Sequence, residues 1–148
     1  MEVHVRSARH TDLASVARLL ARAEEEPEGE RDDVDHLRPL LVVPSATVAV
    51  AEVDRRIVGV GVLAIRPSVR SGPFVGVIDE LWIERGDVLA TAERRIVADD
   101  LVEHLAASAR NKGCTRVEVS EPLASAEPSL WKRLGFASRG RTLRRAIG

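Results

Sequence analysis

The apolar and polar positions of this chain change period several times, and each change predicts a new secondary-structure element. Residues 3–6 alternate apolar and polar side chains, as in a short half-buried strand. A period of two returns over residues 47–53 and 56–65, which predicts two further strands. Asp54 and Arg55 lie between these runs and predict the tight turn of an antiparallel hairpin.

Two helices are predicted between the first strand and the hairpin. Apolar residues recur every three to four positions over residues 13–20, with Thr11 placed to cap that helix. A second, shorter helix is expected to begin at a cap formed by Asp32 or Asp33 and to end before Pro44. The acidic segment between the two helices predicts a loop.

A nearly continuous apolar run follows at residues 77–83, and it is typical of a strand buried on both faces. Asp79 and Glu80 interrupt the run. Two carboxylates in such a strand are unusual, because burying a charge costs free energy unless a partner compensates it. They are therefore candidates for chemistry.

A long helix is predicted after this strand, because apolar residues recur every three to four positions from Ala92 onward. Thr91 is a plausible N-cap, and Gly113 is placed to stop the helix. Arg116–Val119 then predicts a strand parallel to the previous one, since a helix of about twenty residues joins the two. A strand that leads into the N-terminus of a helix is a place where anions bind.

The end of the chain predicts a loop at residues 122–127, a helix at 128–134 that Gly135 ends, and a last strand or hairpin arm at 136–147. The element order is then βααβββαβαβ. This order predicts an α/β (α+β) fold with a mixed, mostly antiparallel central sheet and helices on both faces. We expect one domain over residues 1–148.

Composition narrows the class of protein. The formal charge of -1 argues against a general nucleic-acid or membrane binder. The single cysteine, Cys114, excludes a disulfide framework and makes a reduced cytoplasmic compartment the default. The longest apolar run, residues 57–65, is too short to span a bilayer. No spacing of histidine or cysteine predicts a metal site.

The strand VIDELWI, the long helix after it and the segment LWKRLGF near the end resemble the GNAT N-acetyltransferase superfamily. The resemblance covers nearly the whole chain. It implies that acetyl-CoA lies as cosubstrate between the fourth and fifth strands, here residues 77–84 and 116–119. It also implies that the pantetheine arm pairs with the backbone of the fourth strand, around Trp82, Ile83 and Glu84.

The phosphate loop of that family, Gln/Arg-x-x-Gly-x-Gly/Ala, aligns with residues 93–98. Only Ala98 fits, because Glu93 reverses the charge of the first position and Ile96 replaces the middle glycine. Two arrangements are open. If the helix begins near Ala92, phosphate would meet the amides of residues 92–94 and the side chains of Arg94 or Arg95. If a loop persists, phosphate would meet the amides of Ile96, Val97 and Ala98.

The resemblance also locates the chemistry. Trp131 stands where the family commonly has a tyrosine that protonates the departing thiolate, and an indole is not an acid near neutral pH. Glu80 is the candidate general base, and burial among apolar neighbours would raise its pKa. Alternatively, Glu80 pairs with an arginine across the sheet. Asp79 is a weaker candidate because its side chain is expected to face the opposite side.

The expected function is acetyl transfer from acetyl-CoA to a primary amine of a small molecule or peptide. The acidic segment from Glu24 to Asp35 either attracts a cationic amine or is a solvated loop. The basic end from Lys132 to Arg145 is not expected to bind nucleic acid, because it lacks an aromatic stacking surface. A homodimer is left open. The alternative is a catalytically degenerate GNAT-fold module that binds acyl-CoA or a regulatory partner.

Overall fold

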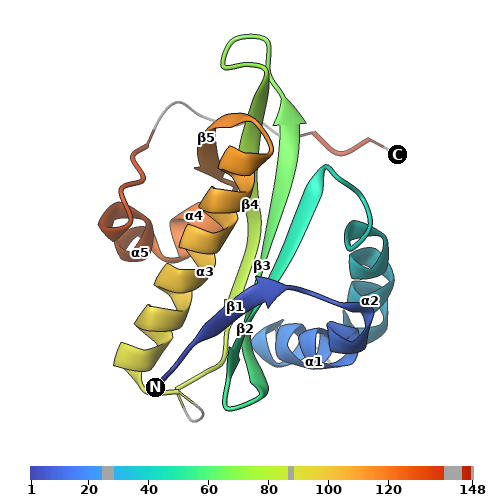
Figure 1. Cartoon of the computed structure of the whole chain (residues 1–148), viewed down its shortest axis with the longest axis vertical. Coiled ribbons are helices and arrows are strands. Elements are labelled where there is room, and N and C mark those ends of the chain that lie inside the picture. The colour runs from blue at the N-terminus through green and yellow to red at the C-terminus, as the bar shows by residue number, and fades with distance from the viewer. Residues whose placement is uncertain (25–28, 87–88, 139–144, 148) are drawn as a thin grey trace.

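The computed structural model describes residues 1–24, 29–86, 89–138 and 145–147, and over residues 23–34 it describes no side chains. Its centre is a five-stranded sheet with the strand order β1-β2-β3-β4-β5 (Figure 1). Neighbouring strands are antiparallel, except that β4 and β5 run parallel. The strands are β1 (His4–Ser7), β2 (Ala46–Val53), β3 (Arg56–Pro67), β4 (Phe74–Ile83) and β5 (Cys114–Val119).

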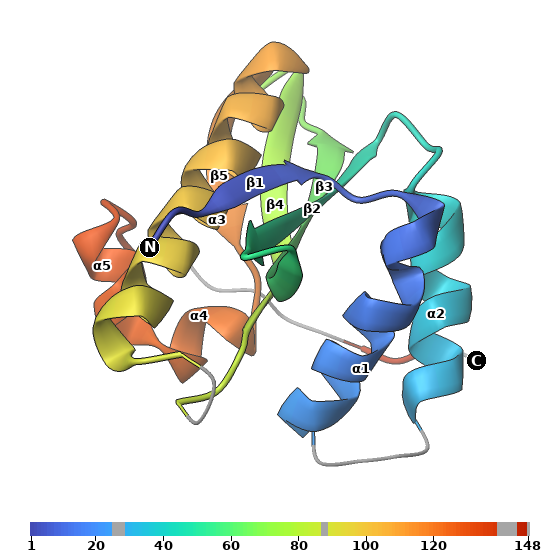
Figure 2. The ribbon, with the colours of Figure 1, turned by 60° about the horizontal axis from the view of Figure 1, so that its bottom comes forward.

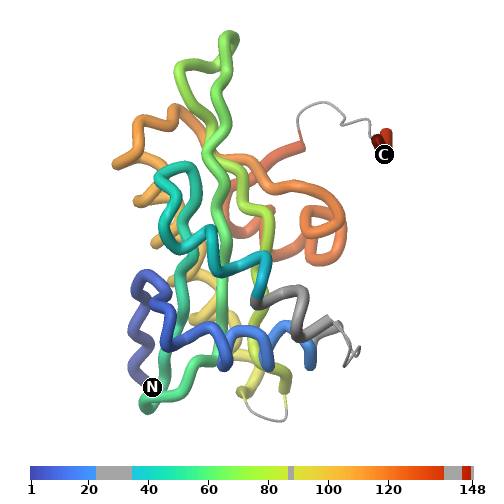
Figure 3. Tube along the Cα trace, turned by 90° about the vertical axis from the view of Figure 1, so that its right-hand side faces the viewer, coloured from blue at the N-terminus to red at the C-terminus, as the bar shows by residue number. Residues whose placement is uncertain are grey.

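Helices cover both faces of the sheet. In Figure 2, α1 and α2 lie on one side of the strands, and α3 and α5 lie on the other. Figure 3 shows the β3–β4 loop extending at the end of the sheet opposite the β2–β3 turn. The helices are α1 (Leu13–Glu24), preceded by a 3-10 turn (His10–Asp12), α2 (Gly29–Leu40), α3 (Thr91–Asn111), α4 (Leu123–Ala126) and α5 (Pro128–Arg133).

The alternation along β2 divides the core into two layers. Val48 and Val50 pack with α1, whereas Ala49 and Ala51 pack with α3. Small residues on the α3 side let this helix approach the sheet closely. A Cβ atom placed on Gly61 would lie only 2.9 Å from Cδ1 of Leu105, so a side chain there would force Leu105 to move.

The β2–β3 hairpin closes as the sequence predicts. Asp54 and Arg55 have φ angles of 50° and 65°, which is the left-handed pair of a type I′ turn. This turn matches the right-handed twist of the two strands. The α/β (α+β) fold class, the mostly antiparallel sheet and the parallel β4–β5 pair are all confirmed.

Several element boundaries differ from the predictions. The N-cap of α3 is Ala90 and not Thr91, and α2 begins at Gly29, before the expected caps. Segment 122–127 contains α4, because Pro122 has backbone angles that suit a first helical turn. The described parts of the expected last strand, residues 136–138 and 145–147, are not in a strand, and the rest of it lies outside the described residues.

Candidate functional site

Strands β4 and β5 pair at one end and separate at the other. Their register runs from Phe74↔Cys114 to Ile78↔Val119, where β5 ends. Beyond Ile78, β4 continues to Ile83 and pairs only with β3 on its other side. The second half of β4 therefore has one edge that no strand covers in the described structure.

Ser120 fixes the point where the two strands part. Its backbone N–H donates to the carbonyl of Ile78 at 3.2 Å, and its hydroxyl donates to Oδ1 of Asp79 at 3.0 Å. Asp79 is thus tied to the end of β5. The sequence analysis did not single out Ser120, although its place directly after a parallel strand was a usable signal.

A β-bulge at Asp79 determines which backbone groups face the uncovered edge. Val62 pairs with Glu80 and Leu63 pairs with Ile78, so Asp79 is an extra residue in β4. Before the bulge, the carbonyl of Ile78 points toward β5 and accepts from Ser120. After the bulge, the backbone N–H and C=O groups again face the two edges of β4 in turn, but with the odd-numbered and even-numbered residues exchanged.

The phase after the bulge follows from Glu84, whose N–H donates to the carbonyl of Val58 in β3 at 2.8 Å. Alternate residues of a strand direct their N–H and C=O groups to the same edge. Trp82 therefore also faces β3, and Leu81 and Ile83 face the uncovered edge. The backbone groups of Trp82 and Glu84, which were expected to pair with the pantetheine arm, face β3 instead. The backbone of Ile83 faces the uncovered edge.

Glu80 lies on the α1 side of the sheet, together with Trp82. Its Oε2 accepts a hydrogen bond from the indole Nε1 of Trp82 at 2.7 Å, and Trp82 in turn packs against the cluster beneath α1. The side chain of Glu80 is exposed, so the burial expected from its apolar neighbours is absent. The reason is the bulge, which turns two consecutive residues, Asp79 and Glu80, toward solvent.

The N-terminus of α3 begins soon after the end of β4. The first helical hydrogen bond runs from the N–H of Arg94 to the carbonyl of Ala90 at 2.9 Å. The N–H groups of residues 91–93 therefore have no acceptor within the helix. Of the two arrangements considered for phosphate, the early helix start is the one observed, except that the Arg94 amide is already bonded.

The later arrangement, in which a loop persists to Ala98, is not observed. Residues 96–98 lie in the second turn of α3, where helical hydrogen bonding uses their amides. Val97 is fully buried and Ala98 is 4% exposed, so both are core residues, while Ile96 is exposed. The apolar period of α3 requires this placement, because its core face begins at Val97.

Arg94 and Arg95 differ in their surroundings. Nε of Arg94 donates to the backbone carbonyl of Glu84 at 2.9 Å and so ties the start of α3 to the end of β4. Arg95 is exposed, and among the described residues it has no ion pair or side-chain hydrogen bond. Of these two arginines, Arg95 is therefore the one without a described partner.

The carboxylate of Glu84 is buried at 2% exposure and joins three elements. Its Oε2 is 2.6 Å from Nη2 of Arg22 in α1 and 3.9 Å from Nη2 of Arg56 in β3. The same residue accepts from Arg94 of α3 through its carbonyl. Glu84 therefore connects α1, β3 and α3. It does not line the uncovered edge, although the sequence predicted that it would.

The uncovered edge of β4 next to β5 and the helix N-terminus that follows it lie where the resemblance to acetyltransferases implies that acetyl-CoA binds. The family model described as the Acetyltransferase (GNAT) family matches residues 13–136. The chain belongs to this family.

Solved structures with the same fold include GNAT enzymes of different kinds. An aminoglycoside N-acetyltransferase, AAC(6')-Iy, in complex with CoA has a TM-score of 0.82 at 17% identity, covering 99% of this chain and 95% of that chain. A ribosomal-protein-alanine N-acetyltransferase from Brucella melitensis biovar Abortus 2308 has a TM-score of 0.77 at 20% identity, with 99% and 100% covered. A comparison with curated protein sequences found no match.

A third similar structure is not named as an acetyltransferase. A transcriptional regulator from Bacillus halodurans C-125 has a TM-score of 0.77 at 17% identity, covering 99% of this chain and 100% of that chain. At these identities the structural likeness shows the fold, and it does not show the acceptor.

Trp131 of this GNAT protein has a structural role. Its Nε1 donates to the carbonyl of Leu123 at 3.1 Å, and its ring packs edge-to-face against Phe136 with the ring centroids 5.4 Å apart. The indole is 4% exposed and links α5 to α4. The cofactor contact expected for Trp131 finds no support in this geometry.

The charged segments contribute little to the described site. Residues 25–28 of the acidic segment lie outside the described residues, and no side chains from 23 to 34 are described. Of the basic end, Arg133 forms an ion pair with Asp99 at 2.6 Å, and residues 139–144 lie outside the described part. None of the described helices is both long and apolar enough to cross a membrane.

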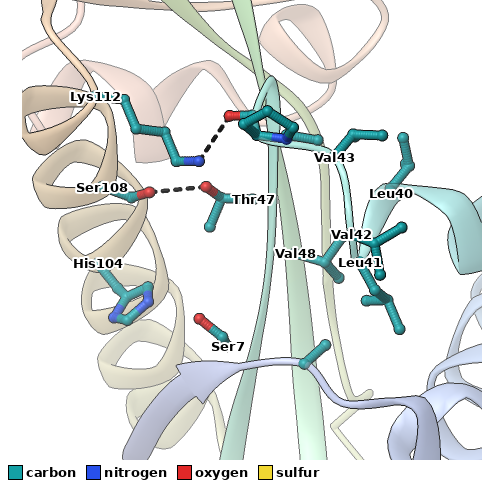
Figure 4. Close-up of a pocket in the computed structure, with 13 residues that line it drawn as sticks. Ser7, Leu40, Leu41, Val42, Val43, Thr47, Val48, His104, Ser108 and Lys112 are labelled. Carbon is teal, nitrogen blue, oxygen red and sulfur yellow. Dashed lines mark hydrogen bonds between the residues drawn. The ribbon is translucent and has the colours of Figure 1, made fainter.

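A pocket of about 330 Å³ lies away from this site, between the end of α2 and the second half of α3 (Figure 4). The hydroxyls of Thr47 and Ser108 lie 2.8 Å apart there, and Nζ of Lys112 donates to the carbonyl of Pro44 at 2.7 Å. Burial lowers the pKa of His104, which also lines it. No residue predicted to bind the cofactor reaches this pocket.

Proposed function

We propose that this GNAT protein transfers the acetyl group of acetyl-CoA to a primary amine of a small molecule or peptide. The observation that carries the proposal is the uncovered edge of β4 beyond Ile78. An amide-containing chain can add to such an edge as an extra strand would. The edge leads toward the N-terminus of α3, where amides without an acceptor in the helix suit a pyrophosphate.

Two sets of backbone groups would hold acetyl-CoA. Leu81 and Ile83 would pair with the amides of the pantetheine arm, because their N–H and C=O groups face the opening. The amides of residues 91–93 would receive the pyrophosphate. Arg95 would add a positive charge that offsets the carboxylate of Glu93 in the same turn.

Glu80 would act as the general base. An alkylammonium ion has a pKa of about 10.4, so only about 1 amine in 2,500 is neutral at pH 7. A carboxylate within reach of the ammonium group, directly or through one water molecule, takes up its proton, and the neutral nitrogen then attacks the thioester carbon. The indole N–H of Trp82 would keep the Glu80 carboxylate on the α1 side of the strand, where an acceptor has access.

Acetyl-CoA supplies the thioester whose carbon–sulfur bond breaks as the carbon–nitrogen bond forms. This chain places no tyrosine near the opening, because it contains none. A thiol has a pKa of about 8.5, so a thiolate can depart without a strong acid. The proton that Glu80 removes from the amine would pass to solvent, since the Glu80 side chain is exposed.

A second candidate function is binding of acyl-CoA without turnover. The buried Trp131, whose N–H is already bonded to Leu123, favours it, because no acid replaces the family's tyrosine there. The similar fold of a protein named as a transcriptional regulator also fits this reading.

Calorimetry with CoA and acetyl-CoA, followed by an assay of thiol release with a panel of primary amines, tests both functions. The proposal predicts binding of both ligands and thiol release with at least one amine. Binding without thiol release from any amine would favour the second function. Absence of binding at millimolar acetyl-CoA would contradict both.

A further inference from the structure

A second pocket lies at the end of the sheet that carries the β2–β3 turn. It has a volume of about 420 Å³ and is lined mainly by charged side chains from β1, α1, β2 and the turn. Its five arginines are Arg6, Arg18, Arg22, Arg55 and Arg56. None of the residues proposed to hold acetyl-CoA lines it.

The two carboxylates that line this pocket, those of Asp12 and Glu52, both accept hydrogen bonds from Arg6. Nη1 and Nη2 of Arg6 donate to the two oxygens of Asp12 at 2.7 and 3.0 Å, and Nε donates to Glu52 at 3.1 Å. The N–H of Arg9 also donates to Asp12 at 2.8 Å. These contacts occupy both carboxylates that line the pocket, so its other arginines do not pair with them.

The remaining arginines have few negative partners. Arg22 is bonded to Glu84, and Arg56 is 3.9 Å from the same carboxylate. Arg18 donates to the hydroxyl of Ser15 at 3.3 Å, and neither Arg18 nor Arg55 has an ion pair with a described residue. The chain has a net charge of -1, so this positive surplus is local to the pocket.

We propose that this pocket binds a small metabolite that carries phosphate groups, through Arg18 and Arg55. Guanidinium groups bind phosphate oxygens in pairs, and uncommitted ones need not first give up a protein carboxylate. The volume is within the range of small-molecule sites. Single-stranded nucleic acid fits less well, because no aromatic side chain lines the pocket for base stacking.

Calorimetry with inorganic pyrophosphate at about 50 mM salt tests this site, since such charge interactions weaken as salt rises. We expect binding by the wild-type protein and an affinity at least about tenfold lower in the double variant Arg18→Ala/Arg55→Ala. Arg70→Ala is the matched control, because Arg70 is an exposed arginine in the β3–β4 loop at the opposite end of the sheet. Its affinity should equal that of the wild type.

Equal affinities of the double variant and the wild type would place the anion elsewhere and overturn the proposal. So would absence of binding at millimolar pyrophosphate. Tighter binding of succinate than of pyrophosphate would overturn the assignment to phosphate. Displacement of pyrophosphate by a tighter-binding single-stranded RNA would overturn the assignment to a small molecule. If the double alanine variant is not folded by circular dichroism, Arg18→Gln/Arg55→Gln replaces it in the same comparison.

Discussion

Replacing Glu80 by glutamine removes the proposed proton acceptor and keeps the shape of the side chain. The glutamine oxygen can still accept the hydrogen bond from the indole N–H of Trp82, which is 2.7 Å long in the wild type. The strand should therefore keep its geometry. The affinity for acetyl-CoA should also stay unchanged, because Leu81 and Ile83 would hold it through the backbone.

The rate of amine acetylation should fall in this variant. General base catalysis is worth about 10² to 10⁴, or roughly 3–5 kcal/mol of activation free energy. Glu80 is exposed, so water and buffer can partly replace it, and we expect a loss near the lower limit, about 10²-fold. Raising the pH should recover activity, because the neutral amine increases about tenfold per pH unit below its pKa.

Steady-state thiol release between pH 6 and pH 9 measures this effect. Glu118→Gln is the matched control, since Glu118 is a partly exposed carboxylate on the neighbouring strand β5 and pairs with Arg66 and Arg116. It should acetylate amines at the wild-type rate. If Glu80→Gln also shows the wild-type rate across this pH range, the carboxylate is not the base and the reasoning is wrong.

Three further predictions concern stability, each measured by urea unfolding. Glu84→Ala should lower the free energy of unfolding by about 1–3 kcal/mol, because it removes a buried carboxylate whose partner, Arg22, is half exposed; a loss below about 0.5 kcal/mol would refute the role of Glu84. Gly61→Val should cost about 1–3 kcal/mol by overpacking against α3, and an unchanged stability would show that the helix can shift. Hydrogen bonding from Arg6 lowers the pKa of Asp12, so this carboxylate stabilises the fold above its unfolded pKa of about 4 and loses that effect as the pH falls through the lower folded value. Asp12→Asn should therefore cost most near neutral pH and progressively less in acid, and a cost that does not change with pH would contradict this.

Most of the fold was predictable because the spacing of apolar residues indicates which face of each helix or strand is buried. The change from a nearly continuous apolar run to a helical period near Ala92 located the start of α3 within one residue of the observed Thr91. The turn at Asp54 and Arg55 was predictable because only two residues, both polar, join the alternating strands, and such a connection has few conformations.

The site was less predictable, because it depends on pairing between strands. The extra residue at Asp79 changes which backbone groups of β4 face the opening, and a single sequence does not show where a bulge falls. The two adjacent carboxylates did mark this position. The helical state of residues 96–98 was hard to predict for a related reason, since the family alignment suggests a phosphate loop there although Val97 and Ala98 begin the core face of α3.

In the function that we propose, the uncovered edge of β4 and the N-terminus of α3 together hold acetyl-CoA. Backbone amide chemical shifts recorded by NMR during a titration with CoA test it residue by residue. We expect the largest chemical-shift changes at Leu81 and Ile83 and at residues 91–93. Changes confined to residues 96–98, or to the pocket around His104, would contradict it.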